Sequence, residues 1–194
     1  LPIDRASTAQ ALGFESVQEP VTAVQLSRGK AESQLAFEIS LVMLDVGRLA
    51  SDLLLFYTQE FAFVELPDAF TTGSSIMPQK RNPDVFELIR GRTATAQACL
   101  FEILGIVSKL PSGYQRDLQL IKAALFRSID LCLDTLSILP AALAGVRFRG
   151  DNIKLDPSIH AAAQANELVV KEGIPFRDAY RRVGAKLKKL TGDE

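Results

Sequence analysis

Three long stretches of the sequence carry apolar residues at intervals of three and four positions, and this spacing constrains the fold more than any other feature. The stretches cover residues 31–61, 83–110 and 117–139. Because an α-helix turns once every 3.6 residues, such spacing gathers the apolar side chains on one face of a helix. The first stretch alone would form a helix about 45 Å long. The sequence therefore predicts an all-α fold in which three long antiparallel helices form a bundle.

The same spacing predicts which side chains face the centre of the bundle. In the first stretch they are Leu35, Ile39, Val42, Val46, Leu49, Leu53 and Phe56. In the second they are Val85, Leu88, Ile89, Ala96, Cys99, Leu100, Ile103, Val107 and Leu110. In the third they are Leu118, Ile121, Leu125, Ile129, Cys132 and Leu136. Gly47 is expected at a close helix crossing, and Pro140 is expected to end or kink the third helix.

The remainder of the chain predicts a smaller helical unit after the bundle. Residues 146–156 are polar and basic, as in a connector. One short helix should then run to Gly173, and another should start at Pro175 or Phe176 and end near Leu190. We therefore expect two domains, a central helical-bundle domain over residues 1–145 and a small helical C-terminal domain over residues 146–194.

Composition narrows the possible partners and locations. The net charge of −1 argues against a nucleic-acid surface. The longest uncharged run, Thr135 to Val146, is too short to cross a bilayer, and no signal peptide is recognised. Hydrophobic residues make up 47% of the chain, which suggests faces buried against further copies of it. Cys99 and Cys132 fall in apolar helical patterns and are interpreted as reduced core residues of a cytoplasmic protein.

Residues 72–83 form the least helical segment between the first two long helices. They read Thr-Gly-Ser-Ser-Ile-Met-Pro-Gln-Lys-Arg-Asn-Pro and contain two cations and no acid. Backbone N–H groups, hydroxyls and positive charge in one loop suit an anionic ligand. The alternative is an ordinary surface turn in which Asn82 caps the next helix and Pro83 opens it.

Residues 73–83 resemble the signature GSSxMPxKxNP of the fumarase/aspartase superfamily. Four flanking segments, 2–5, 65–68, 87–91 and 173–180, resemble the argininosuccinate lyases in that superfamily. The resemblance implies a β-elimination that splits argininosuccinate into arginine and fumarate, a step of arginine biosynthesis, without metal or cofactor. It also implies a homotetramer whose active sites each combine segments from three subunits. Because residues 2–5 match a segment roughly in mid-chain, the sequence corresponds to a C-terminal portion that is expected to be inactive alone.

The resemblance also assigns roles within the loop and just after it. Ser74 matches the base that removes the carbon-bound proton, whereas Lys80 and Asn82 match residues that hold substrate and stabilise the carbanion. Glu87 matches an acid that orients a histidine of another subunit. From the residues alone, Ser74 could simply bond the loop backbone, and Glu87 could be a solvated acid near a helix N-terminus. Arg81 is expected to point to solvent.

A second group of matching residues follows the second long helix. Tyr114, Gln119 and Lys122 match residues that bind the two ends of argininosuccinate, although a solvated helix start is the structural alternative. The family often carries two acids where this chain has Leu120 and Ile121.

Two other functions remain open at this stage. One is a sister lyase that acts on adenylosuccinate, and the other is a catalytically silent relative such as a delta-crystallin. His160 is the only histidine and is expected on the surface, outside the site. No Cys/His cluster or series of carboxylates suggests a metal site.

Overall fold

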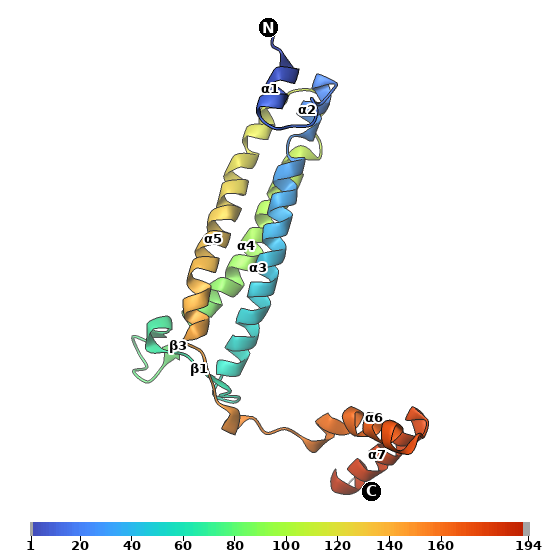
Figure 1. Ribbon diagram of the computed structural model, residues 1–194. Coiled ribbons are helices and arrows are strands. Elements are labelled where there is room, and N and C mark those ends of the chain that lie inside the picture. Colours follow the sequence, from blue (N-terminus) through green and yellow to red (C-terminus); the bar gives the residue numbers. More distant parts are fainter. Residues whose placement is uncertain (1, 192–194) are drawn as a thin grey trace. The chain divides into compact units, whose positions relative to one another are not determined.

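Figure 1 shows the computed structural model, which describes residues 2–191. Three long helices, α3 (Lys30–Tyr57), α4 (Asp84–Val107) and α5 (Ile121–Ala144), pack antiparallel as a bundle. Short helices α1 (Arg5–Ala11) and α2 (Val21–Ser27) precede them. The predicted all-α class is confirmed.

The remaining elements are short and lie in the connections of the bundle or in the C-terminal part of the chain. The two-residue strands are β1 (Val64–Glu65), β2 (Thr72–Gly73), β3 (Arg81–Asn82) and β4 (Arg147–Phe148). Strand β1 pairs with β4, and β2 pairs with β3, both antiparallel. The 3-10 turns are η1 (Asp68–Phe70), η2 (Arg116–Gln119), η3 (Gly150–Asn152) and η4 (Pro157–His160), and the last helices are α6 (Ala161–Glu172) and α7 (Phe176–Thr191).

The buried stripe of α3 differs from the predicted one. Ile39, Val46 and Leu53 are buried as expected. Leu35, Val42 and Leu49 are instead 46%, 41% and 38% exposed, and the inner positions beside them are Ala36, Met43 and Ala50, all with no exposed area. Because alanine is small, α4 and α5 can approach α3 closely along that line. The larger side chains are left on the outside, as are Leu88 of α4 and Leu136 of α5.

Gly47 confirms the prediction of a close helix crossing. A Cβ atom built at Gly47 would lie 2.3 Å from Oγ1 of Thr93 on α4. That hydroxyl donates to the carbonyl of Met43 at 3.0 Å, so it also ties the two helices together. Glycine is therefore required here for space rather than for an unusual backbone conformation.

Two helix boundaries differ from those that the sequence offered. Pro140 does not end α5, which continues to Ala144 because Ala142 is fully buried and Leu139 and Leu143 pack on the core. That packing offsets the hydrogen bond lost at proline. Asn82 does not cap α4 either. It belongs to strand β3, Pro83 occupies the cap position without a side-chain bond, and α4 begins at Asp84.

The chain divides into two compact units, Leu1–Arg149 and Gly150–Glu194. Residues 147–149 belong with the first unit because β4 pairs with β1 and Arg149 forms an ion pair with Glu65 at 2.6 Å. In the second unit, α6 and α7 pack around Ala165, Ala179 and Val183, and α6 closes at Gly173 as predicted.

His160 is exposed, also as predicted. Over residues 2–191, no helix is long and apolar enough to cross a membrane.

Candidate active site

The loop between α3 and α4 is closed at its base by the β2–β3 ladder, which pairs Thr72 with Asn82 and Gly73 with Arg81. Residues 74–80 project from this ladder. The side-chain oxygen of Ser74 accepts hydrogen bonds from the backbone N–H groups of Ile76 at 3.3 Å and Met77 at 3.2 Å. The N–H of Lys80 donates to the carbonyl of Met77 at 3.0 Å and closes a second turn. The loop therefore folds around the Ser74 hydroxyl.

Three side-chain interactions connect the base of the loop to its surroundings. The hydroxyl of Tyr57 donates to the carbonyl of Arg81 at 3.3 Å. Nε of Arg81 lies 3.6 Å from Oδ1 of Asp68, so this side chain turns to an acid rather than freely to solvent as predicted, although it remains about half exposed. The hydroxyl of Thr72 donates to the carboxylate of Asp84, the first residue of α4.

The sequence did not predict these three contacts. Asp68 lies in the flanking segment 65–68, and the resemblance of that segment to the argininosuccinate lyases was the only sequence feature that drew attention to this residue. No sequence pattern pointed to Tyr57, and the loop pattern that includes Thr72 did not indicate its contact with Asp84.

The structure brings four of the expected site residues to this end of the bundle: Ser74, Lys80, Asn82 and Glu87. Ser74 and Asn82 are half-buried, whereas Lys80 and Glu87 are exposed. Within the described part of the chain, the side chains of Lys80 and Glu87 form no ion pair or hydrogen bond. Glu87 lies in the first turn of α4, where the helix dipole favours a negative charge. A cation and a carboxylate are thus both free to meet a ligand or another chain.

The second group of expected residues lies at the opposite end of the bundle. Tyr114 precedes η2, Gln119 ends it, and Lys122 lies in the first turn of α5. Nε2 of Gln119 donates to the hydroxyl of Tyr114 at 3.3 Å, and all three side chains are exposed.

This turn is fixed from beneath by Leu118 and Ile121, which are only 3% and 1% exposed. Ile121 packs with Cys99 and Ile103. It therefore occupies a core position, which explains an apolar residue there. Leu120 is 63% exposed and has no such role.

The two groups of expected site residues do not meet within one chain. Helix α4 begins at the loop and ends just before the Tyr114 segment, so its length separates them (Figure 1). Its 24 residues span about 36 Å at 1.5 Å per residue. No single substrate of ordinary size can contact both groups of one chain.

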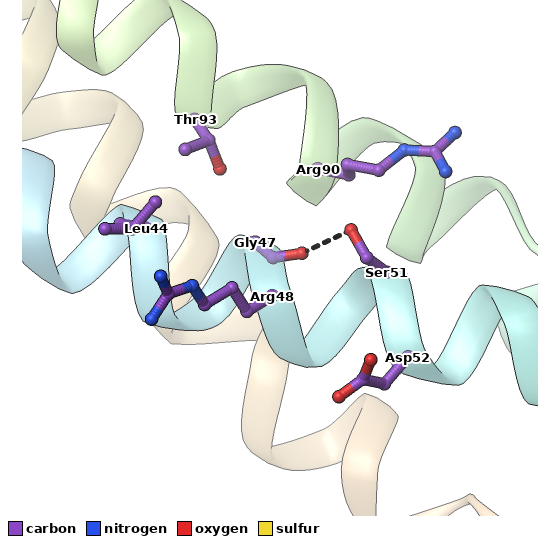
Figure 2. A pocket seen from close by; sticks show the side chains of 7 residues that line it. All are labelled: Leu44, Gly47, Arg48, Ser51, Asp52, Arg90 and Thr93. Atoms are coloured by element: carbon purple, nitrogen blue, oxygen red, sulfur yellow. Dashed lines mark hydrogen bonds between the residues drawn. The ribbon is translucent and has the colours of Figure 1, made fainter.

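A cavity of about 280 Å³ lies between these two ends, where α3 and α4 cross. Figure 2 shows its seven lining residues, Leu44, Gly47, Arg48, Ser51, Asp52, Arg90 and Thr93. None of them is an expected site residue. The charged side chains of this cavity form no ion pair or hydrogen bond with any described residue, and the helical pattern gave no reason to select them.

The titratable groups elsewhere add no metal site within residues 2–191, where no cluster of three or more His, Cys, Asp or Glu side chains could hold a metal ion. Cys99 and Cys132 are buried free thiols, as predicted. Burial raises the pKa of Cys132, and Nε of Arg127 donates to Sγ of Cys99 at 3.2 Å.

Comparisons with known proteins identify the family of this chain. A protein-family model described as Lyase matches residues 2–98. The chain belongs to this lyase family.

Curated relatives named argininosuccinate lyase are similar to the chain along nearly its whole length. The protein from Sorangium cellulosum is 47% identical over 100% of this chain and 45% of its own length. That from Xylella fastidiosa is 47% identical over 93% and 41%, and that from Stenotrophomonas maltophilia is 46% identical over 95% and 43%. The predicted resemblance to argininosuccinate lyases is confirmed, and the chain spans less than half the length of these relatives.

Solved structures share the fold at low identity. An EDDS lyase in complex with formate is 22% identical, with a TM-score of 0.69 over 98% of this chain and 39% of that protein. A class II fumarase from Schistosoma mansoni is 18% identical, with a TM-score of 0.66 over 94% and 40%. A fumarate lyase:delta crystallin from Brucella melitensis is 18% identical, with a TM-score of 0.67 over 96% and 42%. The chain therefore shares its fold with these solved structures.

Proposed function

We propose that this chain forms part of an enzyme that splits argininosuccinate into arginine and fumarate. The observation that carries the proposal is the Ser74 hydroxyl, which accepts two backbone N–H groups inside the loop that resembles the superfamily signature. The whole-length similarity to proteins named argininosuccinate lyase supports the choice of substrate.

The reaction requires an enzyme to manage negative charge. Removing a proton from a carbon next to a carboxylate creates a carbanion whose charge spreads into that carboxylate. The electron pair then forms the double bond of fumarate and expels the nitrogen of arginine, which takes up a proton. Fixed cations and N–H donors aimed at the developing charge lower the barrier most effectively.

Ser74 is the proposed base. A serine hydroxyl can accept the carbon-bound proton only if its alkoxide is stabilised. Donors at 3.2 Å and 3.3 Å already point at the side-chain oxygen and favour its charged form. Lys80 on the same loop would add positive charge and hold a substrate carboxylate, and Asn82 would donate its amide. Glu87 would orient a histidine of another subunit that carries the second proton.

The remaining contacts would come from a different copy of the chain. Tyr114, Gln119 and Lys122 would hold the two ends of the substrate, but about 36 Å separates them from the loop of their own chain. We therefore infer a homotetramer with shared active sites. The exposed apolar residues along α3, Leu35, Val42 and Leu49, supply a surface that a second copy could cover. The two buried free thiols fit a reducing cytoplasm.

The test is a turnover assay on the full-length protein that contains this chain. Fumarate absorbance should rise with argininosuccinate and stay flat with adenylosuccinate. Release of fumarate from adenylosuccinate instead would indicate the sister lyase. An intact, tetrameric protein that released fumarate from neither substrate would contradict the proposal and favour a silent structural relative. Sedimentation that showed only monomers at micromolar concentration would contradict the tetramer.

A further inference from the structure

Tyr57 is the last residue of α3, and it links the bundle core to the signature loop. Its half-buried ring packs against the core cluster that contains Leu53, Val64 and Phe86. Its hydroxyl donates to the carbonyl of Arg81 at 3.3 Å. One end of this side chain is therefore held by packing, and the other end holds the backbone of strand β3.

The position of the bonded carbonyl gives this contact its importance. Arg81 is covalently joined to Lys80 on one side and to Asn82 on the other. Both neighbours are proposed to hold the substrate. A shift of the Arg81 carbonyl would therefore displace both functional side chains together.

The other contacts hold the loop less firmly. Within the described chain, residues 74–80 form hydrogen bonds and ion pairs only with one another. The β2–β3 ladder joins the two sides of the loop but not the loop to the bundle. The Arg81–Asp68 ion pair is exposed, with Asp68 at 82%, and such pairs contribute little. The Thr72–Asp84 bond fixes strand β2 rather than strand β3, which directly follows Lys80.

We propose that Tyr57 is a positioning residue whose hydroxyl holds Lys80 and Asn82 in the geometry required for elimination. This inference rests on the proposed function. The phenol suits the task at neutral pH because burial raises the pKa of Tyr57 above its ordinary value, so the hydroxyl remains a donor.

The substitution Tyr57→Phe in the full-length enzyme tests the inference because it removes only the hydroxyl and keeps the ring in the core. Hydrogen exchange of the peptide that covers residues 72–83 should become about two- to tenfold faster, the range expected for one lost hydrogen bond. Turnover of argininosuccinate should fall about tenfold, with the thermal unfolding midpoint nearly unchanged. Tyr180→Phe is the matched control, since this tyrosine is 66% exposed on α7 and should change none of these values.

A double-mutant cycle separates positioning from a general loss of stability. If Tyr57 acts through Lys80, then Tyr57→Phe should lower kcat/KM much less in a Lys80→Met enzyme than in the wild type. Fully additive effects would overturn the inference, as would unchanged exchange in the loop. Faster exchange in a protein whose wild type releases no fumarate would uphold the anchor and overturn the proposed function instead.

Discussion

At one end of the bundle Ser74 and Lys80 lie on a loop that projects from a two-residue ladder. At the other end Tyr114 and Gln119 lie on a turn that is seated on the core. Residues 74–80 form no hydrogen bond or ion pair outside the loop among the described residues. The Tyr114–Lys122 turn, by contrast, is held by the buried side chains of Leu118 and Ile121. The comparison suggests that the loop end requires anchors such as Tyr57, while the far end is preorganised by packing.

The same comparison bears on how an active site is completed. Each chain carries the loop with Ser74 and Lys80 near one end of α4 and the turn with Tyr114 and Gln119 near the other end, about 36 Å away. A working site must then take its loop from one copy and its substrate-binding turn from another.

The largest effect is expected at the loop end, for Ser74→Ala in the full-length enzyme. Turnover should fall at least ~10³-fold, which corresponds to about 4 kcal/mol of barrier. Folding should hardly change because this loop hydroxyl contributes no core packing. Fumarate absorbance measures the rate, and calorimetry on the same preparation should still detect substrate binding. Ser75→Ala is the control, since the neighbouring hydroxyl forms no hydrogen bond with a described residue and should keep turnover within tenfold of wild type.

A smaller effect, and one on binding, is expected at the far end. Lys122→Met should remove a charge-assisted hydrogen bond to a substrate carboxylate and lower kcat/KM about 10- to 100-fold, mainly through a higher KM. Lys109→Met changes another exposed lysine at the same end of the bundle and should leave KM unaltered. Equal effects of the two substitutions would argue that general charge, rather than the predicted site, attracts the substrate.

Substitutions in the helices between the two ends should change the free energy of unfolding rather than the rate of the reaction. Gly47→Ala would place a methyl group 2.3 Å from Oγ1 of Thr93 and should destabilise the bundle by about 1–3 kcal/mol. Gly105→Ala on α4 meets no atom within 4 Å and should be neutral or stabilising by up to about 1 kcal/mol. Chemical unfolding of both variants checks the expected difference in sign. A stable Gly47→Ala protein would mean that the α3–α4 crossing can relax.

Helical periodicity predicted the three long helices, because leucine, isoleucine and valine dominate each stretch. It did not predict which side of α3 is buried. Ala36 and Ala50 weigh little in an apolar pattern, yet their small size lets neighbouring helices approach, and Leu35 and Leu49 are left outside. The alternative that Asn82 caps the helix fails because Asn82 pairs with Thr72 in the β2–β3 ladder, and helical periodicity does not reveal this pairing.

The candidate site was predictable where a short segment carries its own signal. The loop was found from its glycine, hydroxyls and cations, and from its resemblance to the superfamily signature. The anchor at Tyr57 could not be found in this way, since a tyrosine at the end of an apolar helix looks like any other core residue. Its function depends on which backbone carbonyl lies within reach of the hydroxyl, and only the folded chain shows this.

In the proposed enzyme one site combines the loop of one copy with the far end of another, and co-expression of two impaired variants tests this directly. In the full-length chain, Ser74→Ala removes the proposed base from the loop, and Lys122→Met removes a proposed substrate-binding residue from the far end. In mixed symmetric tetramers about a quarter of the sites should receive two intact halves, so kcat/KM, measured at limiting substrate, should rise to about a quarter of the wild-type value and exceed that of either variant alone. If the mixed tetramers showed only the average of the two parent activities, both halves would have to belong to one chain, and the account would be contradicted.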